Sequence, residues 1–439
     1  MTKIDERAAS DRVVITNVYA DDNRGGAAIT ASAIEMARTI APDSPITLLT
    51  VASDPKLIPQ QFRFTRLLYP DVEILPAIIR LHELGPTARL RHYLQTIGYL
   101  LSPRLAAARV PAVARLREAG LVIGKGGQAF RGFRLRELGS LWFTTLPLLL
   151  ACRMRRRVAV VGVSIGPFSK GRASRQLAGF VLRRLSLLIV RGPESQAAAL
   201  ALRVPRSIIR LAPDSVFFLP APSPQDRIKV LTQRRLEDQK FAVATLGELP
   251  SRPDLRRKKI EVVGEILARL LDEGLVSQAV VVVQTHGKTS DLRISSDCVA
   301  HCADPRIALV EQEMSHIELI ALYSGAAVTI GGRLHSTIFS LLSGTPAFPL
   351  AFFNKPHDVF SVLGLSEFVL DIRTTRPEAL ADRVISTLRD SPNLRQDLAA
   401  LSVEMRRRLT THVESLVSPR VSRATDVTSD RRGWPACDA

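Results

Sequence analysis

Residues 329–336 read Thr-Ile-Gly-Gly-Arg-Leu-His-Ser, so an apolar strand ends at two glycines immediately before a predicted helix. This order places Arg333 and His335 in the turn between the carboxyl end of a strand and the N-terminus of a helix. An anion in such a turn meets backbone N–H groups, the positive end of the helix dipole and a guanidinium fork together. The alternative interpretation is a tight turn with Arg333 at the protein surface.

The same order of strand, turn and helix repeats along the whole chain. Short runs rich in apolar and mostly β-branched residues lie at 13–18, 46–51, 121–124, 158–162, 187–190, 241–245, 280–283 and 327–330, and a further apolar run lies at 346–352. These runs are apolar throughout, as strands are when helices cover both faces of a parallel sheet. The pattern predicts an α/β protein with two Rossmann-like, doubly wound domains and an active site in the interdomain cleft.

A proline-rich polar segment at 220–228 interrupts this pattern and is predicted to be the interdomain linker. It separates an N-terminal domain at 12–219 from a C-terminal domain at 229–417. Residues 1–11 are expected to be flexible. Residues 418–439 are polar and rich in arginine and aspartate, so we expect them to be disordered.

Other turns after strands carry residues suited to the same cleft. Arg191 ends a buried-type strand ahead of a helix, although a surface ion pair with Glu194 is the alternative. Two glycine-rich loops follow strands without the spacing of a P-loop or a dinucleotide motif. They contribute the candidate residues Lys125, Gly126, Gly127, Ser164 and Gly166.

Three more candidate side chains follow predicted strands. Two lie in the second half of the chain, and the third lies just ahead of the linker. Lys355 comes after the strand at 346–352 and His286 after the strand at 280–283, so both are expected to face the cleft. Asp214 is a lone carboxylate ahead of the linker, and capping of a turn is its alternative role.

The composition is that of a basic protein, with 60 Lys and Arg against 42 Asp and Glu and a formal net charge of +18. Residues 81–210 alone hold 23 basic and 4 acidic side chains. Such a field suits an anionic ligand, nucleic acid or an anionic membrane surface. Only 5% of residues are aromatic and no nucleic-acid module is recognised, so nucleic acid is not an expected partner.

The expected location is the cytoplasm, because the four cysteines make no disulfide framework and the first ten residues lack the apolar core of a secretory signal. The arginine-flanked apolar stretch at 131–157 suits peripheral contact with the inner face of the cell membrane. A crossover helix covering the sheet is the alternative. Cys298 and Cys302 have helical spacing but no second ligand cluster follows, so we expect no metal.

In their order along residues 12–390, these segments resemble the polysaccharide pyruvyl transferase family. The resemblance rests on Asn23 to Ala28, on Gly-Lys-Gly-Gly at 124–127, Ser-Ile-Gly-Pro at 164–167, Arg-Gly-Pro-Glu-Ser at 191–195, Asp214, Gly-Gly-Arg-Leu-His at 331–335, Ser-Gly-Thr-Pro at 343–346 and Lys355. Two positions depart from the family pattern. Gly26 stands where the early turn of the family commonly has aspartate, and Lys125 replaces the second glycine of a glycine triplet.

The resemblance implies a GT-B-like fold and transfer of a pyruvyl group from phosphoenolpyruvate to a sugar, with no further cofactor. It assigns donor-binding roles to Arg191, Arg333, Leu334 and Lys355 by position in the family motifs. Arginine forks and a lysine suit the carboxylate and phosphate of this donor. We hypothesise that His335 is the general acid or base. The remaining candidate cleft residues are Asn23, Gly25, Gly26, Lys125, Gly126, Gly127, Ser164, Gly166, Asp214 and His286.

The acceptor implied by the resemblance is a saccharide or a lipid-linked saccharide, met by the N-terminal domain while the C-terminal domain holds the donor. Two alternatives remain open from the sequence. A nucleotide-sugar glycosyltransferase of the same fold also cradles a diphosphate at glycine-rich strand ends. The other alternative is a catalytically silent, envelope-associated relative of the family, because Gly26 replaces the aspartate that the family commonly has at this position.

Overall fold

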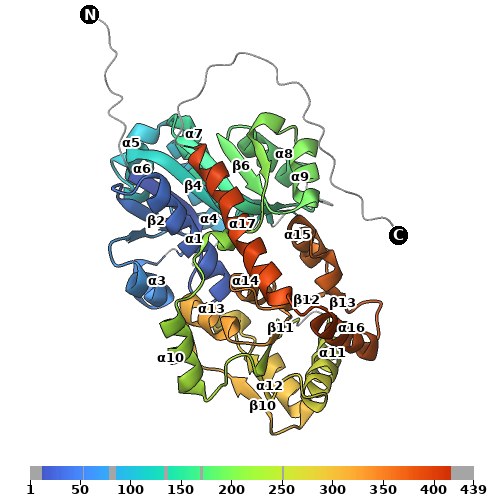
Figure 1. The fold of residues 1–439 in the computed structure, drawn as a ribbon. Helices are drawn as coiled ribbons and strands as arrows, with labels where there is room; N and C mark the ends of the chain where they lie inside the picture. Colours follow the sequence, from blue (N-terminus) through green and yellow to red (C-terminus); the bar gives the residue numbers. More distant parts are fainter. Residues whose placement is uncertain are drawn as a thin grey trace, which may run out of the picture.

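The computed structural model describes residues 12–52, 54–78, 86–132, 137–168, 172–249 and 252–416. They form two parallel β-sheets with helices on their faces, one sheet in each half of the chain (Figure 1). The predicted α/β class with two doubly wound domains is therefore confirmed. The expectations for residues 1–11 and 418–439 concern segments outside the described residues.

The first sheet has seven parallel strands in the order β3-β2-β1-β4-β5-β6-β7. Its strands are β1 (Arg12–Val18), β2 (Ile46–Thr50), β3 (Glu73–Leu75), β4 (Ala119–Phe130), β5 (Arg157–Ile165), β6 (Leu187–Val190) and β7 (Ile209–Leu211). Its helices are α1 (Arg24–Ile40), α2 (Ile58–Gln61), α3 (Arg63–Leu68), α4 (Pro86–Leu101), α5 (Pro103–Ala107), α6 (Pro111–Glu118), α7 (Glu137–Arg153), α8 (Arg172–Leu182) and α9 (Pro193–Ala201), with 3-10 turns η1 (Pro55–Leu57), η2 (Arg206–Ile208) and η3 (Ser215–Phe218).

The second sheet has six parallel strands in the order β10-β9-β8-β11-β12-β13. They are β8 (Phe241–Thr245), β9 (Gln278–Val282), β10 (Ile307–Val310), β11 (Val328–Gly331), β12 (Ala347–Ala351) and β13 (Leu370–Asp371). The helices are α10 (Pro224–Arg234), α11 (Pro253–Asp272), α12 (Leu292–Cys302), α13 (His316–Ser324), α14 (Leu334–Leu341), α15 (Lys355–Leu363), α16 (Pro377–Asp390) and α17 (Leu394–Glu414), with 3-10 turns η4 (Gly287–Thr289) and η5 (Ser366–Phe368).

Burial explains the apolar character of the central strands. Every residue of β6, β8, β11 and β12 is buried. Helices pack on both faces of each sheet, so neither face of such a strand contacts water and both sets of alternating side chains are apolar. Because all strands in a sheet are parallel, their carboxyl ends lie along one edge, and the turns predicted to carry the site lie along these edges.

Two segments join the halves of the molecule. The predicted linker at 220–228 includes the start of α10, because Ser223 caps that helix by accepting from Asp226 N and Pro224 occupies its first turn. The last helix, α17, belongs by sequence to the second half but packs on α1 and η3 of the first (Figure 1). Arg157 of β5 donates to the carbonyl of Leu416 at 2.6 Å, just beyond the end of α17.

The apolar part of the stretch at 131–157 forms α7, which packs on β4 and β5. Leu146, Leu148 and Leu150 are fully buried against the sheet. These side chains therefore cover the sheet, as a crossover helix does, and do not face a membrane. Within the described ranges, no helix combines the length and the apolarity that crossing a membrane requires.

The turn at the end of β11 depends on close approach of the backbone of β8. Gly332 N donates to the carbonyl of Thr245 at 2.7 Å. A Cβ atom added to Gly332 would lie 2.4 Å from that oxygen, and a Cβ on Gly331 would lie 2.2 Å from Thr337 Cγ2. The two glycines are therefore required by packing, and they bring the N-terminus of α14 to the edge of the sheet.

Gly332→Ala should destabilise the protein, because the added methyl group meets a backbone oxygen that is fixed in β8. We expect a loss of about 1–3 kcal/mol, the usual cost of overpacking, measured by thermal unfolding. Gly98→Ala is the matched control, since nothing lies within 4 Å of its Cβ position in α4, and it should be neutral or stabilising by about 0.5–1 kcal/mol. Equal unfolding temperatures for wild type and Gly332→Ala would contradict the packing argument.

Candidate functional site

A cavity of about 1130 Å³ lies between the two domains. Turns after β5 and β6 line it from the first domain, and turns after β11 and β12 line it from the second. Five predicted site residues are in its wall: Ser164, Gly166, Arg333, Leu334 and Lys355. The cavity therefore lies at the carboxyl ends of the parallel strands of both sheets. Doubly wound folds bind their ligands at this position.

Asp214 and Arg191 form a completely buried ion pair behind the wall of this cavity. Arg191 Nε donates to Ser164 Oγ at 2.9 Å, and Asp214 Oδ1 accepts from Val216 N at 3.1 Å. Burial by itself would raise the pKa of Asp214, but the charge of Arg191 and the hydrogen bonds from Val216 N and Arg191 help to lower that pKa below its usual value. Arg191 Nη2 is buried and has no hydrogen-bond partner among the described residues.

The pairing with Asp214 settles the role of Arg191 in the free protein. The alternative surface pair with Glu194 is wrong, since Arg191 is fully buried and pairs with a carboxylate 23 residues away. Asp214 also fulfils its alternative role, because its side chain caps the turn η3.

His335, in the first turn of α14, reaches the same ion pair from the second domain. Its Nε2 lies 3.8 Å from Asp214 Oδ2, and the imidazole packs on Gly25, where a Cβ would lie 2.3 Å from Nδ1. Burial lowers the pKa of His335 to about 3; the carboxylate of Asp214 opposes this shift, and the cations Arg191, Lys355 and Lys125 add to it. The imidazole is therefore neutral near pH 7 in the free protein.

Two lysines flank this histidine. Burial, with repulsion from Arg191, lowers the pKa of Lys355 to about 7. Burial also lowers the pKa of Lys125 on β4 to about 7, although Asp21 opposes the shift. Both amines therefore titrate near neutral pH, and an anion between them would favour their charged forms.

Arg333 lines the cavity but is already paired. Its Nε donates to Asp291 Oδ2 at 3.0 Å, and Nη2 bonds Asp291 Oδ1. Asp291 is completely buried and also accepts from Thr285 N at 3.1 Å. Sequence reasoning missed Asp291, because it lies 42 residues from Arg333 and no local motif marks it.

A second missed residue, Asp358, connects the two sides of the cavity. Its Oδ1 accepts from Glu194 N at 2.8 Å, in the first turn of α9. Asn354 Nδ2 donates to Glu194 Oε1 at 3.2 Å. The carboxylate also lies against Gly192, where no Cβ fits. Asp358 therefore caps a helix of the other domain, a contact across 164 residues of sequence.

The other glycine-loop candidates lie around the N-terminus of α1 and the end of β4. Gly126 contacts the carbonyl of Val161, 2.3 Å from its Cβ position, and Gly127 has φ +104° with open space around it. Asn23 caps α1 by accepting from Gly26 N at 3.2 Å. His286 follows Thr285, which forms a β-bridge with Asn23 that joins the domains. Its Nε2 is buried and has no hydrogen-bond partner among the described residues. His286 does not line the cavity.

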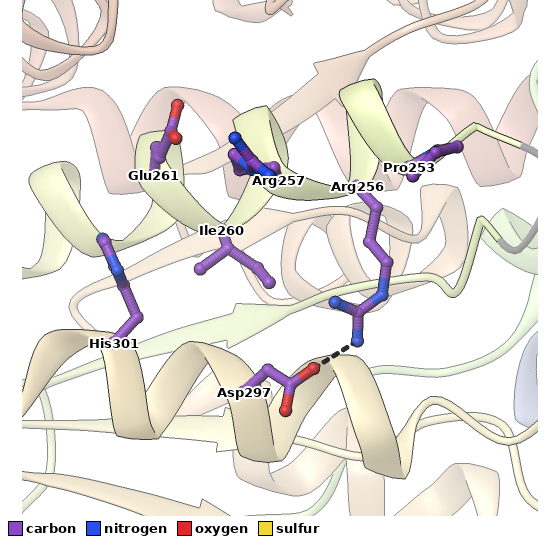
Figure 2. A pocket seen from close by; sticks show the side chains of 7 residues that line it. All are labelled: Pro253, Arg256, Arg257, Ile260, Glu261, Asp297 and His301. Carbon is purple, nitrogen blue, oxygen red and sulfur yellow. Dashed lines mark hydrogen bonds and ion pairs between the residues drawn. The ribbon is translucent and has the colours of Figure 1, made fainter.

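A separate groove of about 500 Å³ lies between α11 and α12. Figure 2 shows the ion pair between Arg256 and Asp297 across it, with His301 at one end. This groove is confined to the second domain and contains none of the predicted site residues. In the part of the chain that the structure describes, no group of three His, Cys, Asp or Glu side chains is arranged to hold a metal ion.

Comparison with known proteins agrees with this architecture. Residues 23–352 match the family described as polysaccharide pyruvyl transferase. The chain is 27% identical over 302 residues to the amylovoran biosynthesis protein AmsJ of Erwinia amylovora, covering 65% of this chain and 69% of that protein.

Among solved structures, the Anabaena protein HepE in complex with UDP-glucose is similar with a TM-score of 0.58 and 12% identity, over 92% of this chain and 98% of HepE. The UDP-GlcNAc 2-epimerase of Neisseria meningitidis gives a TM-score of 0.55 and 10% identity, over 91% of this chain and 99% of the epimerase. These similarities establish the GT-B-like fold.

The pKa of His335 makes stability depend on pH. The unfolded chain protonates this histidine near pH 6.5, whereas the folded site resists protonation down to about pH 3. Stability should therefore fall as the pH drops from about 6.5 toward 3. His335→Gln should flatten part of this fall in denaturant titrations, and His301→Gln, exposed on α12, should leave it unchanged. Identical pH profiles for wild type and His335→Gln would contradict this account.

Proposed function

The chain belongs to the polysaccharide pyruvyl transferase family, and on this premise we propose that it transfers a pyruvyl group from phosphoenolpyruvate to two hydroxyls of a saccharide, forming a cyclic ketal. The observation that carries the proposal is the excess of cations beside the interdomain cavity. Arg191, Lys355 and Lys125 surround one histidine, and Asp214 is the carboxylate paired among them. Positive charge exceeds negative charge in such a site until an anion binds.

Phosphoenolpyruvate supplies that charge with one carboxylate and one phosphate. The free Nη2 of Arg191 and the amine of Lys355 are the donors that we assign to it. Asp291 occupies Nε and Nη2 of Arg333, and the guanidinium has further N–H donors. We therefore also assign Arg333, which lines the cavity beside Leu334, to binding the donor.

In the proposed reaction, one saccharide hydroxyl adds to C2 of phosphoenolpyruvate while C3 takes up a proton. The second hydroxyl then displaces phosphate from C2, so one C–O bond forms and the C–O bond to phosphate breaks. Of the two hydroxyl protons released, one balances the proton gained by C3 and the other leaves with phosphate. His335 is neutral before the donor binds, so it starts as the base that accepts the first hydroxyl proton.

The acceptor is proposed to be a polysaccharide or lipid-linked saccharide, held on the side of the first domain. The relationship to a protein of amylovoran biosynthesis supports a role in exopolysaccharide assembly. The 23 basic and 4 acidic side chains of residues 81–210 suit an anionic acceptor or peripheral attachment to the inner face of the cell membrane. Synthesis on such acceptors would take place in the cytoplasm.

Binding assays should separate phosphoenolpyruvate from a nucleotide sugar as donor. Phosphoenolpyruvate is expected to raise the unfolding temperature, and UDP-glucose is not. Lys355→Met should weaken phosphoenolpyruvate binding by about 10- to 100-fold, the effect of losing a hydrogen bond to a charged group. Lys240→Met removes an exposed lysine and is the control. Stabilisation by UDP-glucose alone would favour the glycosyltransferase alternative.

The affinity for phosphoenolpyruvate should also fall as the pH rises above about 7. Lys355 loses its proton in that range in the free protein, and a neutral amine attracts an anion less strongly. Calorimetric titrations between pH 6 and 9 would measure this slope, and Lys355→Met should reduce it. An affinity independent of pH would show that Lys355 does not contact the donor.

His335→Ala should reduce turnover by about 100-fold or more, within the usual contribution of a general acid or base. Phosphate release measured with phosphoenolpyruvate and the acceptor polysaccharide checks this expectation. Donor binding by the same variant should persist, because Arg191 and Lys355 are retained, and this separates a chemical role from loss of the site. Near-normal turnover in His335→Ala would remove this residue from the mechanism.

A further inference from the structure

Lys125 is a buried cation with no partner in the described part of the chain. Its side chain is on β4, the residue is 3% exposed, and Nζ makes no hydrogen bond. The carboxylate of Asp21 attracts Lys125 electrostatically, but it accepts its hydrogen bonds from Thr65, which donates to its two oxygens at 2.9 and 2.7 Å. The Tyr19 ring, with its centroid 5.6 Å from Nζ, offers only a weak interaction. Burying an ammonium without a partner costs free energy. The buried position of Lys125 Nζ therefore indicates that a bound anion pairs with it.

The ammonium is directed at the N-terminus of α1. A Cβ atom on Gly26 would lie 3.8 Å from Lys125 Nζ, and Gly26 itself is only partly buried. The first turn of α1 has no acidic residue, so the positive end of this 17-residue helix is not compensated by its own sequence. The lysine and the helix therefore direct positive charge at the same space.

We propose that Lys125 and the N-terminus of α1 form a subsite for a carboxylate or phosphate group of a substrate; this inference rests on the proposed transferase function. The subsite adjoins the reacting centre, since Gly25 packs directly on the imidazole of His335. Any side chain at position 26 would begin next to the ammonium. An aspartate there would pair with Lys125, whereas glycine leaves the ammonium free for a ligand.

The two departures from the family pattern thus act together. With aspartate at 26 and glycine at 125, this corner of the cleft would carry a negative charge and no cation. With Gly26 and Lys125, position 26 has no carboxylate and an ammonium is present instead. The anion that it binds belongs either to the donor or to an acidic saccharide acceptor, and a neutral acceptor gains nothing from it.

The test compares the full-length wild type with two variants that remove the free ammonium in different ways. Lys125→Met keeps the length and apolar stem of the side chain while deleting the charge. Gly26→Asp keeps the lysine but supplies a carboxylate to pair with it. Lys229→Met, on the exposed face of α10, controls for the loss of one positive charge. Calorimetry measures binding of phosphoenolpyruvate, inorganic phosphate, glucuronate and glucose.

A fall of about 10- to 100-fold in phosphoenolpyruvate affinity in both variants, and not in Lys229→Met, would support the subsite and assign it to the donor. Unchanged phosphoenolpyruvate affinity with loss of the wild-type preference for glucuronate over glucose would support it and assign it to the acceptor. Unchanged affinities for phosphoenolpyruvate, phosphate and glucuronate would overturn it. If the wild type binds no phosphoenolpyruvate, the proposed donor is wrong, while phosphate and glucuronate still test Lys125.

Discussion

The buried ion pair between Asp214 and Arg191 is the interaction on which the centre of the molecule depends. Neither charge contacts water, so each is tolerated because the other is present and because Val216 N and Ser164 Oγ add further hydrogen bonds. Asp214 follows the last strand of the first sheet, just before the chain crosses to the second domain. There it also faces His335, and this carboxylate therefore couples the two halves of the cleft.

Around this pair the protein gathers more positive than negative charge. The first turns of α1 and α14 meet where Gly25 touches His335, so two positive helix ends converge beside Arg191, Lys125 and Lys355. The lowered pKa values of the histidine and the two lysines have a common origin in burial, and repulsion from Arg191 adds to it for His335 and Lys355. A bound anion stabilises the charged forms of these groups and so offsets the effects of burial and repulsion. The electrostatics of the free protein therefore favour an anionic ligand.

Local sequence predicted the placement of several site residues. Arg191, Arg333, His335 and Lys355 each follow a buried strand, and the structure brings all four to the interdomain turns. Their functional roles stay predictions. The partners of these residues were not predictable: Asp291 lies 42 residues before Arg333, and Asp358 accepts from the backbone of Glu194, 164 residues earlier in the chain. Such pairs are set by how distant elements pack, and no periodicity or turn motif encodes them.

The α/β class and the division into two parallel sheets were evident from the residues alone, since uninterrupted apolar runs and glycine turns are local consequences of strands covered on both faces. Tertiary structure decided which cations are available. Among the described residues, Arg191 Nη2 has no hydrogen-bond partner, Arg333 is held by Asp291, and Lys125 is left unpaired over Gly26. It also decided that His335 is neutral near pH 7. These properties depend on desolvation and on distances of a few ångströms between segments far apart in the chain, so only the packing of the folded protein sets them. For His335, that packing includes the contact between the two domains.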